Sequence, residues 1–292
     1  MHSEKSMISI VIPAFNEEGA IKDTIKTLKS VLSNYNEDYE IIVVDDGSID
    51  KTGLIAESEG VKVIKHPHNI GYGRSLKDGI KGARNDTIVI IDADLTYPAD
   101  AIPELIKIYN EGFDMVVGER TGHHYRGSMF KGPLRKILKL LVEYTAGRKV
   151  PDANSGLRVF SKTTILSYIN HLCDTFSFTT SLTLAYMMTG KFVKYIPIAY
   201  HERIGATKVN LFKDSLRTMQ YIVQSIIYYN PIKIFILLCG IFILLSVAGF
   251  LMAALTKLNA PYYLGIGGLL MAINIFCLGL IADLLRQIMV KK

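Results

Sequence analysis

Cysteine and tryptophan are scarce in this sequence. Tryptophan is absent, and only three cysteines occur among the 292 residues. Two of these, Cys239 and Cys277, lie inside long apolar runs, which argues against a disulfide framework. Basic residues do not form a stripe interleaved with aromatic residues, so the sequence does not favour nucleic acid as a partner. Internal repeats and low-complexity segments are also missing.

Charge is missing from two long segments near the C-terminus. The runs 234–256 and 258–282 contain no charged residue and consist mostly of Ile, Leu, Phe and Ala. A helix needs about 20 apolar residues to cross a bilayer, and each run is longer than that. A pair of buried core helices is the alternative, but core helices are rarely free of charge over such lengths. The sequence therefore predicts two membrane-spanning helices joined by a tight turn at Lys257.

Basic residues flank the predicted hairpin on its outer side. By the positive-inside rule this places both termini and the large N-terminal part in the cytoplasm of a multi-pass protein of the cell membrane. No signal peptide is predicted, because residues 1–7 are polar and the apolar run that follows is short. Hairpins of this kind often associate, so a homo-oligomer is compatible with the sequence. The flanking residues are Arg217, Lys233, Arg286, Lys291 and Lys292.

Residues 7–118 alternate short apolar runs with helical patterns. The runs ISIVIPAF, YEIIVVDDGS, VKVIKH, DTIVIIDAD and FDMVVGER are rich in Val and Ile, as expected for strands covered on both faces. Helical patterns occupy 17–33, 50–59, 73–84 and 99–111. This alternation predicts an α/β fold with a parallel sheet, in which ligands bind beyond the carboxyl ends of the strands.

Two further segments have apolar residues at helical spacing and a basic face. They are 133–146 and 209–229, and both suit helices that lie in the membrane interface. Ordinary amphipathic helices packed on the sheet are the alternative. The predicted organisation is an α/β domain over 1–208, an interfacial helix over 209–230 and a transmembrane hairpin over 231–292. The Gly-rich, basic segment 119–132 is predicted to be a mobile loop.

Acidic residues follow three of the predicted strands. Because the carboxyl ends of parallel strands meet at one edge of a sheet, these residues are expected to lie together. Three acidic clusters at one edge are hard to explain as a solvated face. The clusters are Asn16-Glu17-Glu18, Asp45-Asp46 and the pair Asp92 and Asp94.

The pair Asp92 and Asp94 is the most specific of these signals. Two carboxylates this close raise the pKa of one of them or need a cation beside them. One interpretation is a turn in which Asp94 or Thr96 caps the following helix. The other is a site for Mg²⁺ or Mn²⁺, held by carboxylate oxygens and by a substrate diphosphate. Asp46 at the same edge favours the second interpretation. The net charge of +6 also suits phosphorylated substrates or an anionic membrane face.

Seven segments occur in the order in which they appear in a known family. They are PAFNEE, DDGS, NIGYGRS, DADLTYP, GER, DANSGLRVF and YHERIGATK, and together they resemble family 2 glycosyltransferases with the GT-A fold, a Rossmann-like, mostly parallel sheet. The resemblance covers about residues 7–208. With the predicted hairpin, the chain is similar to the polyprenyl-phosphate glycosyltransferases, the group around dolichol-phosphate mannose synthase. The resemblance implies transfer of a sugar from a nucleotide sugar to a polyprenyl phosphate.

The resemblance also implies roles for particular residues. Arg203 and Lys208 are expected to close over the donor diphosphate and the acceptor phosphate. The nucleotide pocket is expected to comprise Pro13, Ala14, Asn16, Glu17, Asp46, Arg74, Asp92 and Ala93. The metal set is Asp92, Asp94 and Thr96, and the acceptor set is Arg120, Arg135, Lys136, Asp152, Ser155 and Arg158. The catalytic set is Asp92, Asp94, Arg120, Arg135, Arg203 and Lys208.

The sequence departs from the family pattern in two places. Many members have Gln two residues after the second Asp, where this chain has Thr96, so the metal would be held with an extra water or more weakly. The segment FSFTTS, residues 176–181, replaces a Gln/Glu pattern, so no sugar contact is carried over from it.

The chemistry of such an acceptor is consistent with the residues present. A phosphate monoester carries a charge of about −1.5 to −2 at neutral pH and is already a nucleophile. No strong general base is required, which fits the absence of an obvious His–carboxylate pair in the sequence. Cationic clamps and a metal would stabilise the leaving diphosphate. We therefore expect direct displacement with inversion at the anomeric carbon.

Other interpretations explain the sequence less well. A polysaccharide synthase typically carries a QxxRW segment, but this chain has no tryptophan and too few spans to line a pore. A non-catalytic scaffold would not need the acidic and basic clusters. The segment NIGYGRS has Leu76 where a dinucleotide fingerprint has its third Gly. His66 and His68 are assigned to a solvated loop, and His123-His124 to the mobile loop.

The identity of the substrates stays open at this point. UDP-sugars and GDP-sugars are both compatible with the pattern, with UDP slightly favoured. Undecaprenyl and dolichyl phosphate are both compatible as acceptors. The sequence does not specify the sugar.

Overall fold

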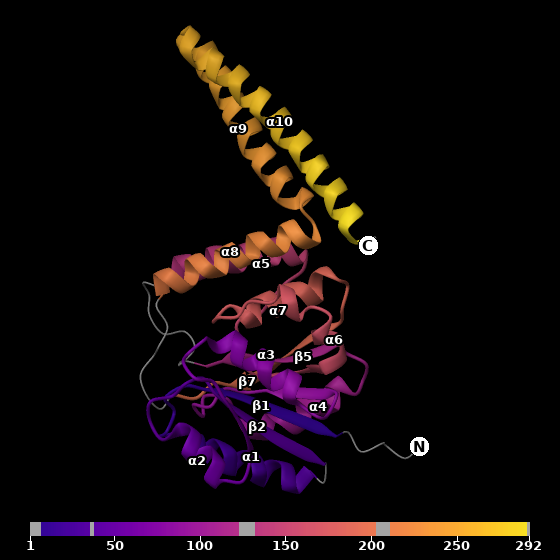
Figure 1. The fold of residues 1–292 in the computed structure, drawn as a ribbon. Helices are drawn as coiled ribbons and strands as arrows, with labels where there is room; N and C mark the ends of the chain where they lie inside the picture. Colours follow the sequence, from indigo (N-terminus) through magenta and orange to yellow (C-terminus); the bar gives the residue numbers. More distant parts are fainter. Residues whose placement is uncertain (1–6, 36–37, 123–131, 203–210, 291–292) are drawn as a thin grey trace. The chain divides into compact units, whose positions relative to one another are not determined.

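The computed structural model describes residues 7–35, 38–122, 132–202 and 211–290. Within these ranges seven strands form one sheet, in the order β3-β2-β1-β4-β6-β5-β7. Figure 1 labels β1, β2, β5 and β7 of this sheet. The five predicted strands correspond to β1–β5, while β6 and β7 were not predicted. The strands are β1 (Ile8–Ala14), β2 (Tyr39–Asp45), β3 (Lys62–Lys65), β4 (Thr87–Ile90), β5 (Met115–Thr121), β6 (Arg158–Ser161) and β7 (Val193–Ala199).

The helices follow the predicted order closely. The four patterns between the strands form α1, α2, α3 and the pair of η1 and α4, and the two amphipathic segments form α5 and α8. The first set comprises α1 (Ile21–Tyr35), α2 (Thr52–Ser58), α3 (Tyr72–Gly82), η1 (Ala99–Ala101), α4 (Ile102–Tyr109) and α5 (Gly132–Ala146). The second set comprises α6 (Lys162–Leu166), η3 (Ile169–His171), α7 (Phe178–Met188), α8 (Leu211–Tyr229), α9 (Ile232–Thr256) and α10 (Asn259–Val290).

The sheet is mixed rather than wholly parallel. Strands β1, β2, β3 and β4 are mutually parallel, and β7 is parallel to β5. Strand β6 runs antiparallel to both of its neighbours, β4 and β5. The expectation of a parallel sheet therefore holds for the half that carries the acidic clusters. It fails at β6. This strand was not predicted because it has only four residues and begins with the buried Arg158, so the sequence shows no apolar run there.

Strand β1 is buried on both faces. Ile8, Ile10 and Ile12 belong to a core cluster that includes the apolar residues of α1. On the other face α3 packs against β1 and β2. The approach is close, since a Cβ atom at Gly79 would lie 2.4 Å from a methyl carbon of Val11. The short distance brings the N-terminus of α3 next to the carboxyl ends of the central strands.

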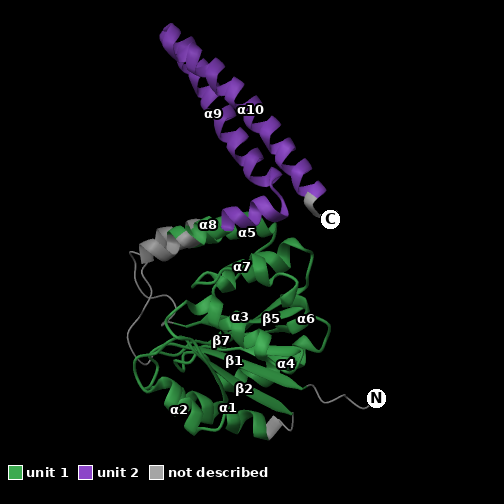
Figure 2. Cartoon of the chain, viewed as in Figure 1, with its two compact units in different colours: residues 1–221 green, residues 222–292 purple. Residues whose placement is uncertain are grey.

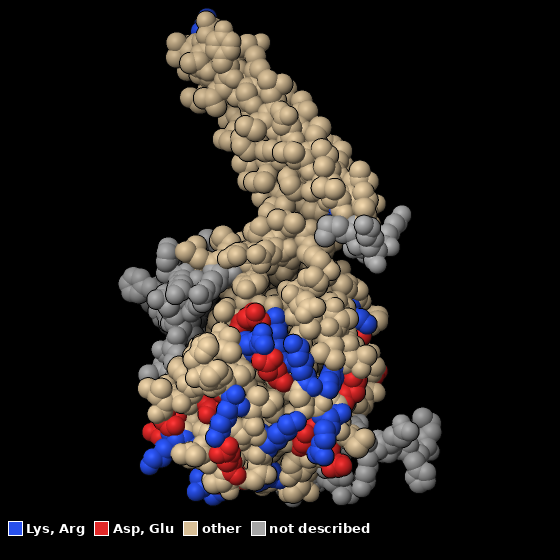
Figure 3. All heavy atoms as spheres, viewed as in Figure 1, with Lys and Arg blue, Asp and Glu red and all other residues tan. Residues whose placement is uncertain are grey.

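The described chain divides into two compact units, residues 1–221 and 222–292 (Figure 2). The division falls inside α8, so the predicted boundaries at 208 and 230 stay predictions. In the second unit α9 and the segment Asn259–Ile288 of α10 are long and apolar enough to cross a membrane, with mean hydropathies of 2.9 and 2.3. Only 11% of the apolar stretch of α9 and 17% of that of α10 is buried, so these are not core helices of the unit. Charged side chains gather on the first unit in the view of Figure 3.

Small residues bring α9 and α10 together. A Cβ atom at Gly249 would lie 2.8 Å from the backbone nitrogen of Gly265, so only glycine allows this approach. Beside it the Ser246 hydroxyl donates a hydrogen bond to the Gly265 carbonyl at 2.6 Å. The turn between the helices is made by Lys257, whose φ is +56°. The predicted hairpin is therefore a packed antiparallel pair.

Gly249→Leu is expected to separate α9 from α10, because the new side chain collides with backbone atoms. Overpacking of this kind costs about 1–3 kcal/mol, so the Tm of the detergent-solubilised protein should fall by roughly 5 °C. The matched control is Gly240→Leu on the same helix, where no atom lies within 4 Å of the added Cβ. Gel filtration after heating would measure the Tm of each variant. Equal Tm values for the two variants would contradict the packing described.

Candidate active site

The loops that follow β1 and β2 are locked together. The Ser48 hydroxyl accepts a hydrogen bond from the Asn16 backbone N–H at 2.9 Å, and the Asn16 side-chain oxygen accepts one from the Ile49 N–H at 2.9 Å. Asn16 has a φ of +51°, a conformation that asparagine tolerates better than most residues. Glu17 follows it, and Pro13 and Ala14 are buried at the end of β1. The predicted nucleotide segment thus forms a fixed rim at the carboxyl edge.

Asp46 binds the loop that leads into α3. Its side chain is buried and accepts hydrogen bonds from the backbone N–H groups of Ile70, at 3.0 Å, and Gly71, at 2.8 Å. The Nδ1 atom of His66 lies 2.7 Å from the same carboxylate. Gly71 has a φ of +127°, which requires glycine. Asp46 therefore fixes residues 66–71 at the carboxyl edge.

His66 corrects one prediction. The sequence predicted a solvated loop at this position, but the His66 side chain is only 7% exposed. The second ring nitrogen, Nε2, lies 3.3 Å from Asp78, which also accepts a hydrogen bond from the Arg74 Nε atom at 2.7 Å. A His–carboxylate pair that the sequence analysis did not find is therefore present. It is buried inside the loop, where it supports the backbone, whereas His68 is exposed as predicted.

Asp94 is buried and held by its own turn. The Thr96 hydroxyl donates a hydrogen bond to Asp94 Oδ1 at 2.6 Å, and the Thr96 backbone N–H lies 3.2 Å from the same oxygen. Leu95, between them, has a φ of +61°. Thr96 is fully buried, so its hydroxyl orients the carboxylate instead of facing a ligand. Nearby, the Ala93 carbonyl accepts a hydrogen bond from Thr24 of α1 at 2.8 Å.

Asp92 lies between α3 and the segment before β6. The Tyr72 hydroxyl donates a hydrogen bond to Asp92 Oδ1 at 2.9 Å. On another side, a Cβ atom at Gly156 would lie 2.6 Å from Asp92 Oδ2, so the carboxylate occupies the space that a side chain would need. The Gly156 N–H in turn donates to the Tyr97 hydroxyl oxygen at 2.7 Å. Asp92 is thus positioned by residues from two other segments, α3 and the chain before β6.

Arg120 and Asp152 form a bidentate ion pair at the end of β5. The Nε atom lies 2.7 Å from Oδ2 and the Nη2 atom 2.8 Å from Oδ1. Burial by itself raises the pKa of a carboxyl, but the hydrogen bonds and charge of Arg120 outweigh it and hold the pKa of Asp152 below its ordinary value. The guanidinium also lies over the Tyr200 ring, 5.5 Å from its centre. Tyr97 packs edge-on against that ring.

Ser155 and Arg158 support the backbone of the segment between Asp152 and β6. Both are fully buried. Arg158 donates hydrogen bonds to the carbonyls of Ser155, at 2.8 Å, and Ala153, at 2.7 Å, and to the Thr183 hydroxyl at 2.8 Å. Ser155 donates to the Gly118 carbonyl. These contacts hold the backbone of residues 153–155 in place, and the expected contact of the two residues with the acceptor stays a prediction.

Some predicted residues lie outside the part of the chain that can be placed. Arg203, Lys208 and the pair His123-His124 fall outside the described residues, as does most of the predicted mobile loop. Arg135 belongs to α5, but its side chain is outside the described part. Lys136 is exposed on the same helix, which packs on α7. Helix α7, which begins with the last four residues of the divergent FSFTTS segment, is almost wholly buried.

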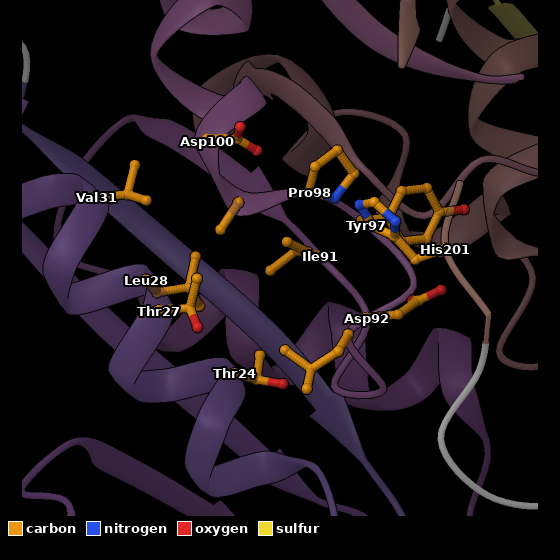
Figure 4. A pocket seen from close by; sticks show the side chains of 12 residues that line it. Thr24, Thr27, Leu28, Val31, Ile91, Asp92, Tyr97, Pro98, Asp100 and His201 are labelled. Carbon is orange, nitrogen blue, oxygen red and sulfur yellow. The ribbon is translucent and has the colours of Figure 1, made fainter. Parts of the chain in front are cut away.

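A cavity of about 260 Å³ opens beside the acidic pair (Figure 4). Asp92, Tyr97 and His201 form one side of it, and α1 forms the other with Thr24 and Leu28. The His201 backbone N–H donates to the Thr96 carbonyl at 2.9 Å, which ties the chain after β7 to the acidic turn. The cavity is mostly apolar, and Asp92 connects it to the carboxyl edge.

Asp92 and Asp94 could hold a hard divalent cation together with a substrate phosphate, but they are too few to hold one without other ligands. Within the described residues, no group of three or more His, Cys, Asp or Glu side chains could hold a metal. Mg²⁺ and similar ions are commonly held by one or two carboxylates together with substrate phosphates and water. Asp92 and Asp94 supply that number of oxygen ligands at the edge where a phosphorylated ligand would bind. The donor set therefore matches a metal–diphosphate complex.

Several positioning residues were missed by the sequence analysis. Tyr72, Tyr97 and Tyr200 hold Asp92, Gly156 and Arg120 by the contacts described above. All three tyrosines lie in motifs that the sequence analysis quotes, namely NIGYGRS, DADLTYP and YHERIGATK, but no role was predicted for their side chains. The tyrosines at 97 and 200 depend on contacts between distant segments, which a pattern of single residues does not report.

The fold and the site define a class of protein before any relative is considered. An α/β sheet presents carboxylates and a fixed arginine at one edge, as expected for a protein that binds a metal-complexed, phosphorylated ligand. The sequence profile of glycosyl transferase family 2 matches residues 9–166, more than half of the chain. The protein therefore belongs to glycosyl transferase family 2 and is a glycosyltransferase, as the motifs predicted.

Relatives with similar sequences cover most of the chain. An uncharacterized protein of Methanocaldococcus jannaschii is 35% identical over 66% of this chain and 81% of its own length. The undecaprenyl-phosphate 4-deoxy-4-formamido-L-arabinose transferase of Pseudomonas fluorescens is 28% identical over 87% of this chain and 71% of its own length. The low-salt glycan biosynthesis hexosyltransferase Agl6 of Haloferax volcanii is 31% identical, over 75% of this chain and 53% of its own length.

Solved structures confirm the predicted GT-A fold. Glucosyl-3-phosphoglycerate synthase from Mycobacterium tuberculosis, crystallised with Mn²⁺, UDP and phosphoglyceric acid, has a TM-score of 0.63 at 19% identity. The alignment covers 75% of this chain and 78% of that chain. The same enzyme with Mg²⁺ and UDP gives a TM-score of 0.62. At this identity the likeness concerns the fold.

Asp152→Asn is expected to destabilise the protein at neutral pH, because it removes the charge that pairs with Arg120. Hydrogen bonds to charged groups contribute about 1.5–3 kcal/mol, so the Tm should fall by roughly 5 °C at pH 7. Because the pKa of Asp152 is lowered by folding, its contribution is present above the unfolded pKa of about 4 and is lost as the pH falls through the lower folded value.

Thermal unfolding of both proteins between pH 7 and pH 3 would measure this effect. The Tm difference should be constant down to about pH 5 and should narrow below pH 4. Asp100→Asn, at an exposed carboxyl of η1, serves as the control. A difference that does not depend on pH would contradict the ion pair as its source.

Proposed function

We propose that this protein transfers a sugar from a nucleoside diphosphate sugar to a polyprenyl phosphate at the membrane surface. The observation that carries the proposal is the extent of the similarity to the undecaprenyl-phosphate transferases. The alignment with the Pseudomonas fluorescens protein spans 264 residues, which exceeds the 221 residues of the first unit. The similarity therefore reaches beyond the catalytic fold into the segment that carries the apolar helices.

The donor binds, in this proposal, across the carboxyl ends of β1, β2 and β4. Asn16 and Glu17 form the rim on one side, and the loop held by Asp46 forms the other. Asp46 fixes residues 66–71 by its hydrogen bonds, and it is also proposed to contact the nucleoside. UDP is favoured as the nucleotide, since the similar structures contain UDP, while GDP stays an alternative to be tested. Arg74 and Ala93 belong to the same region of the edge.

The diphosphate lies against Asp92 and Asp94 in this arrangement. A bound Mg²⁺ or Mn²⁺ would supply Lewis-acid stabilisation of the negative charge that develops on the leaving diphosphate. The protein contributes two carboxylates whose orientation is set before the ligand arrives, by Tyr72 for Asp92 and by Thr96 for Asp94. We propose Thr96 as the residue that orients Asp94, in place of the direct ligand expected from the sequence.

The acceptor phosphate lies beside Arg120 at the end of β5. Asp152 fixes the guanidinium by two hydrogen bonds, and the Tyr200 ring supports it from one face. An arginine held in this way loses little conformational freedom when it binds a phosphate. Arg135 and Lys136 of α5, with Arg203 and Lys208, are proposed to add positive charge around the two phosphates.

The reaction needs orientation and charge stabilisation more than proton transfer. The acceptor phosphate is anionic at neutral pH, so it can attack the anomeric carbon without a general base. His66, which pairs with Asp46 and Asp78, is buried and engaged with the loop. A single in-line displacement follows from this arrangement, and it inverts the anomeric configuration.

The membrane hairpin keeps the enzyme at the surface where its lipid substrate resides. We propose that α9 and α10 span the bilayer with the catalytic domain and both termini in the cytoplasm, according to the positive-inside rule. Exposed apolar residues of the amphipathic helices support an interfacial location, among them Leu140 and Tyr144 of α5 and Leu216 of α8. Association of the hairpins into a homo-oligomer is part of the same proposal.

The direct test is sugar transfer from labelled UDP- and GDP-sugars to polyprenyl phosphate by the purified full-length protein. Label is expected in the lipid phase with Mn²⁺ or Mg²⁺ and should disappear with a chelator. The lipid product should show inverted anomeric configuration by NMR spectroscopy. Nucleotide release without lipid label would point to a different acceptor, and retention of configuration would contradict the single displacement.

Asp94→Asn should reduce the transfer rate by at least 100-fold, because it removes charge from a proposed metal ligand whose geometry is fixed by Thr96. The fold should survive, since asparagine can accept the same hydrogen bond. Asp23→Asn, at an exposed carboxyl of α1, is the matched control and should keep full activity. Transfer rates measured with saturating donor and acceptor would decide. Equal loss in both variants would exclude a specific role for Asp94.

A further inference from the structure

The hydroxyl group of Tyr72 contacts one of the two carboxylates at the carboxyl edge. It donates a hydrogen bond to Asp92 Oδ1 at 2.9 Å, from the first residue of α3. Tyrosine has a single polar atom at the end of a rigid ring, so this contact defines the direction of the carboxylate if the start of the helix is itself fixed. The surroundings of α3 show that it is.

The N-terminus of α3 is attached on two sides. On one side Asp46 accepts the N–H of Gly71, the residue before Tyr72, at 2.8 Å. On the other side the Asp174 carbonyl accepts the N–H of Arg74 at 2.8 Å, and the buried Lys77 pairs with the Asp174 carboxylate at 2.7 Å. These contacts come from segments far apart in the sequence. They leave the Tyr72 backbone no freedom to follow a displaced carboxylate.

The far side of Asp92 is closed by backbone. A Cβ atom at Gly156 would lie 2.6 Å from Asp92 Oδ2, so the carboxylate already fills that space. Gly156 is held in turn by the Tyr97 hydroxyl. The carboxylate therefore lies between a hydrogen-bond donor and a backbone segment, which restricts its rotation.

We infer that Tyr72 is a positioning residue, which orients Asp92 toward the metal–diphosphate of the donor and links that carboxylate to the nucleoside loop held by Asp46. The inference rests on the proposed function, because it takes Asp92 as a group that contacts the donor complex. Residues that hold metal-binding carboxylates by a hydrogen bond usually affect metal affinity or activity by about 10–100-fold when they are replaced.

The test is Tyr72→Phe, which removes one oxygen and keeps the ring. We expect the Mn²⁺ concentration for half-maximal activity to rise by roughly ten-fold, with the KM for the polyprenyl phosphate unchanged. Mn²⁺ binding in the presence of UDP, measured by electron paramagnetic resonance without turnover, should weaken by a similar factor. A general loss of structure would instead change the acceptor KM and the Tm together.

The matched control is Tyr186→Phe on α7. Tyr186 is fully buried, and its hydroxyl has no hydrogen-bond partner among the described residues. This variant should keep wild-type metal dependence. If Tyr72→Phe binds Mn²⁺ and UDP as the wild type does, the inference is wrong, although the proposed function stands. If the wild-type protein shows neither metal-dependent transfer nor UDP-dependent Mn²⁺ binding, the proposed function itself fails.

Discussion

The start of helix α3 lies between two acidic strand ends, and the geometry of the site depends on this placement. Asp46, after β2, accepts hydrogen bonds from the backbone immediately before the helix, while Asp92, after β4, accepts one from Tyr72 at its first residue. The N-terminus of a helix carries partial positive charge, so it stabilises carboxylates nearby. Glycines make the arrangement possible, since Gly79 lets α3 approach β1 and Gly71 adopts the conformation that the loop requires.

The contacts at the start of α3 help to explain how several carboxylates can lie close together at the carboxyl edge before a ligand binds. Each acidic side chain has partners of its own: backbone N–H groups for Asp46, a tyrosine for Asp92, a threonine for Asp94 and an arginine for Asp152. Their orientation is therefore set by the fold. A catalyst that joins two phosphorylated substrates benefits from such preorganisation, because little reorganisation is needed as charge develops on the leaving group.

The sequence predicted the parts of the fold that depend on local pattern. Strands β1–β5, helices α1–α5 and helices α8–α10 were found because their apolar runs and helical spacing are regular, whereas α6 and α7 were not predicted. The acidic clusters were expected at one edge because parallel strands end there. Strand β6 was missed because it is short and begins with Arg158. Strand β7 was missed because it is an edge strand with an exposed Pro197 and Lys194 and little apolar alternation.

The contacts between distant segments could not be predicted in the same way. His66 looked like a loop residue, and only the folded chain brings it against Asp46. Arg158 matched a motif that implied contact with the acceptor, but its guanidinium is fully buried and binds backbone carbonyls. In both cases the residue type indicated that the side chain makes polar contacts. The sequence did not indicate which group it contacts, because tertiary packing determines the partner.

The central claim is that Asp92 and Asp94 face a metal-bound nucleoside diphosphate at the carboxyl edge. A crystal or cryo-electron microscopy structure of the full-length protein with UDP and Mn²⁺ would test it most directly, with the metal located by its anomalous signal where crystals are used. The account predicts the metal between the Asp94 carboxylate and the diphosphate, with the nucleoside against the loop that Asp46 holds. A nucleotide bound elsewhere on the sheet, or a metal that contacts neither Asp92 nor Asp94, would contradict the account.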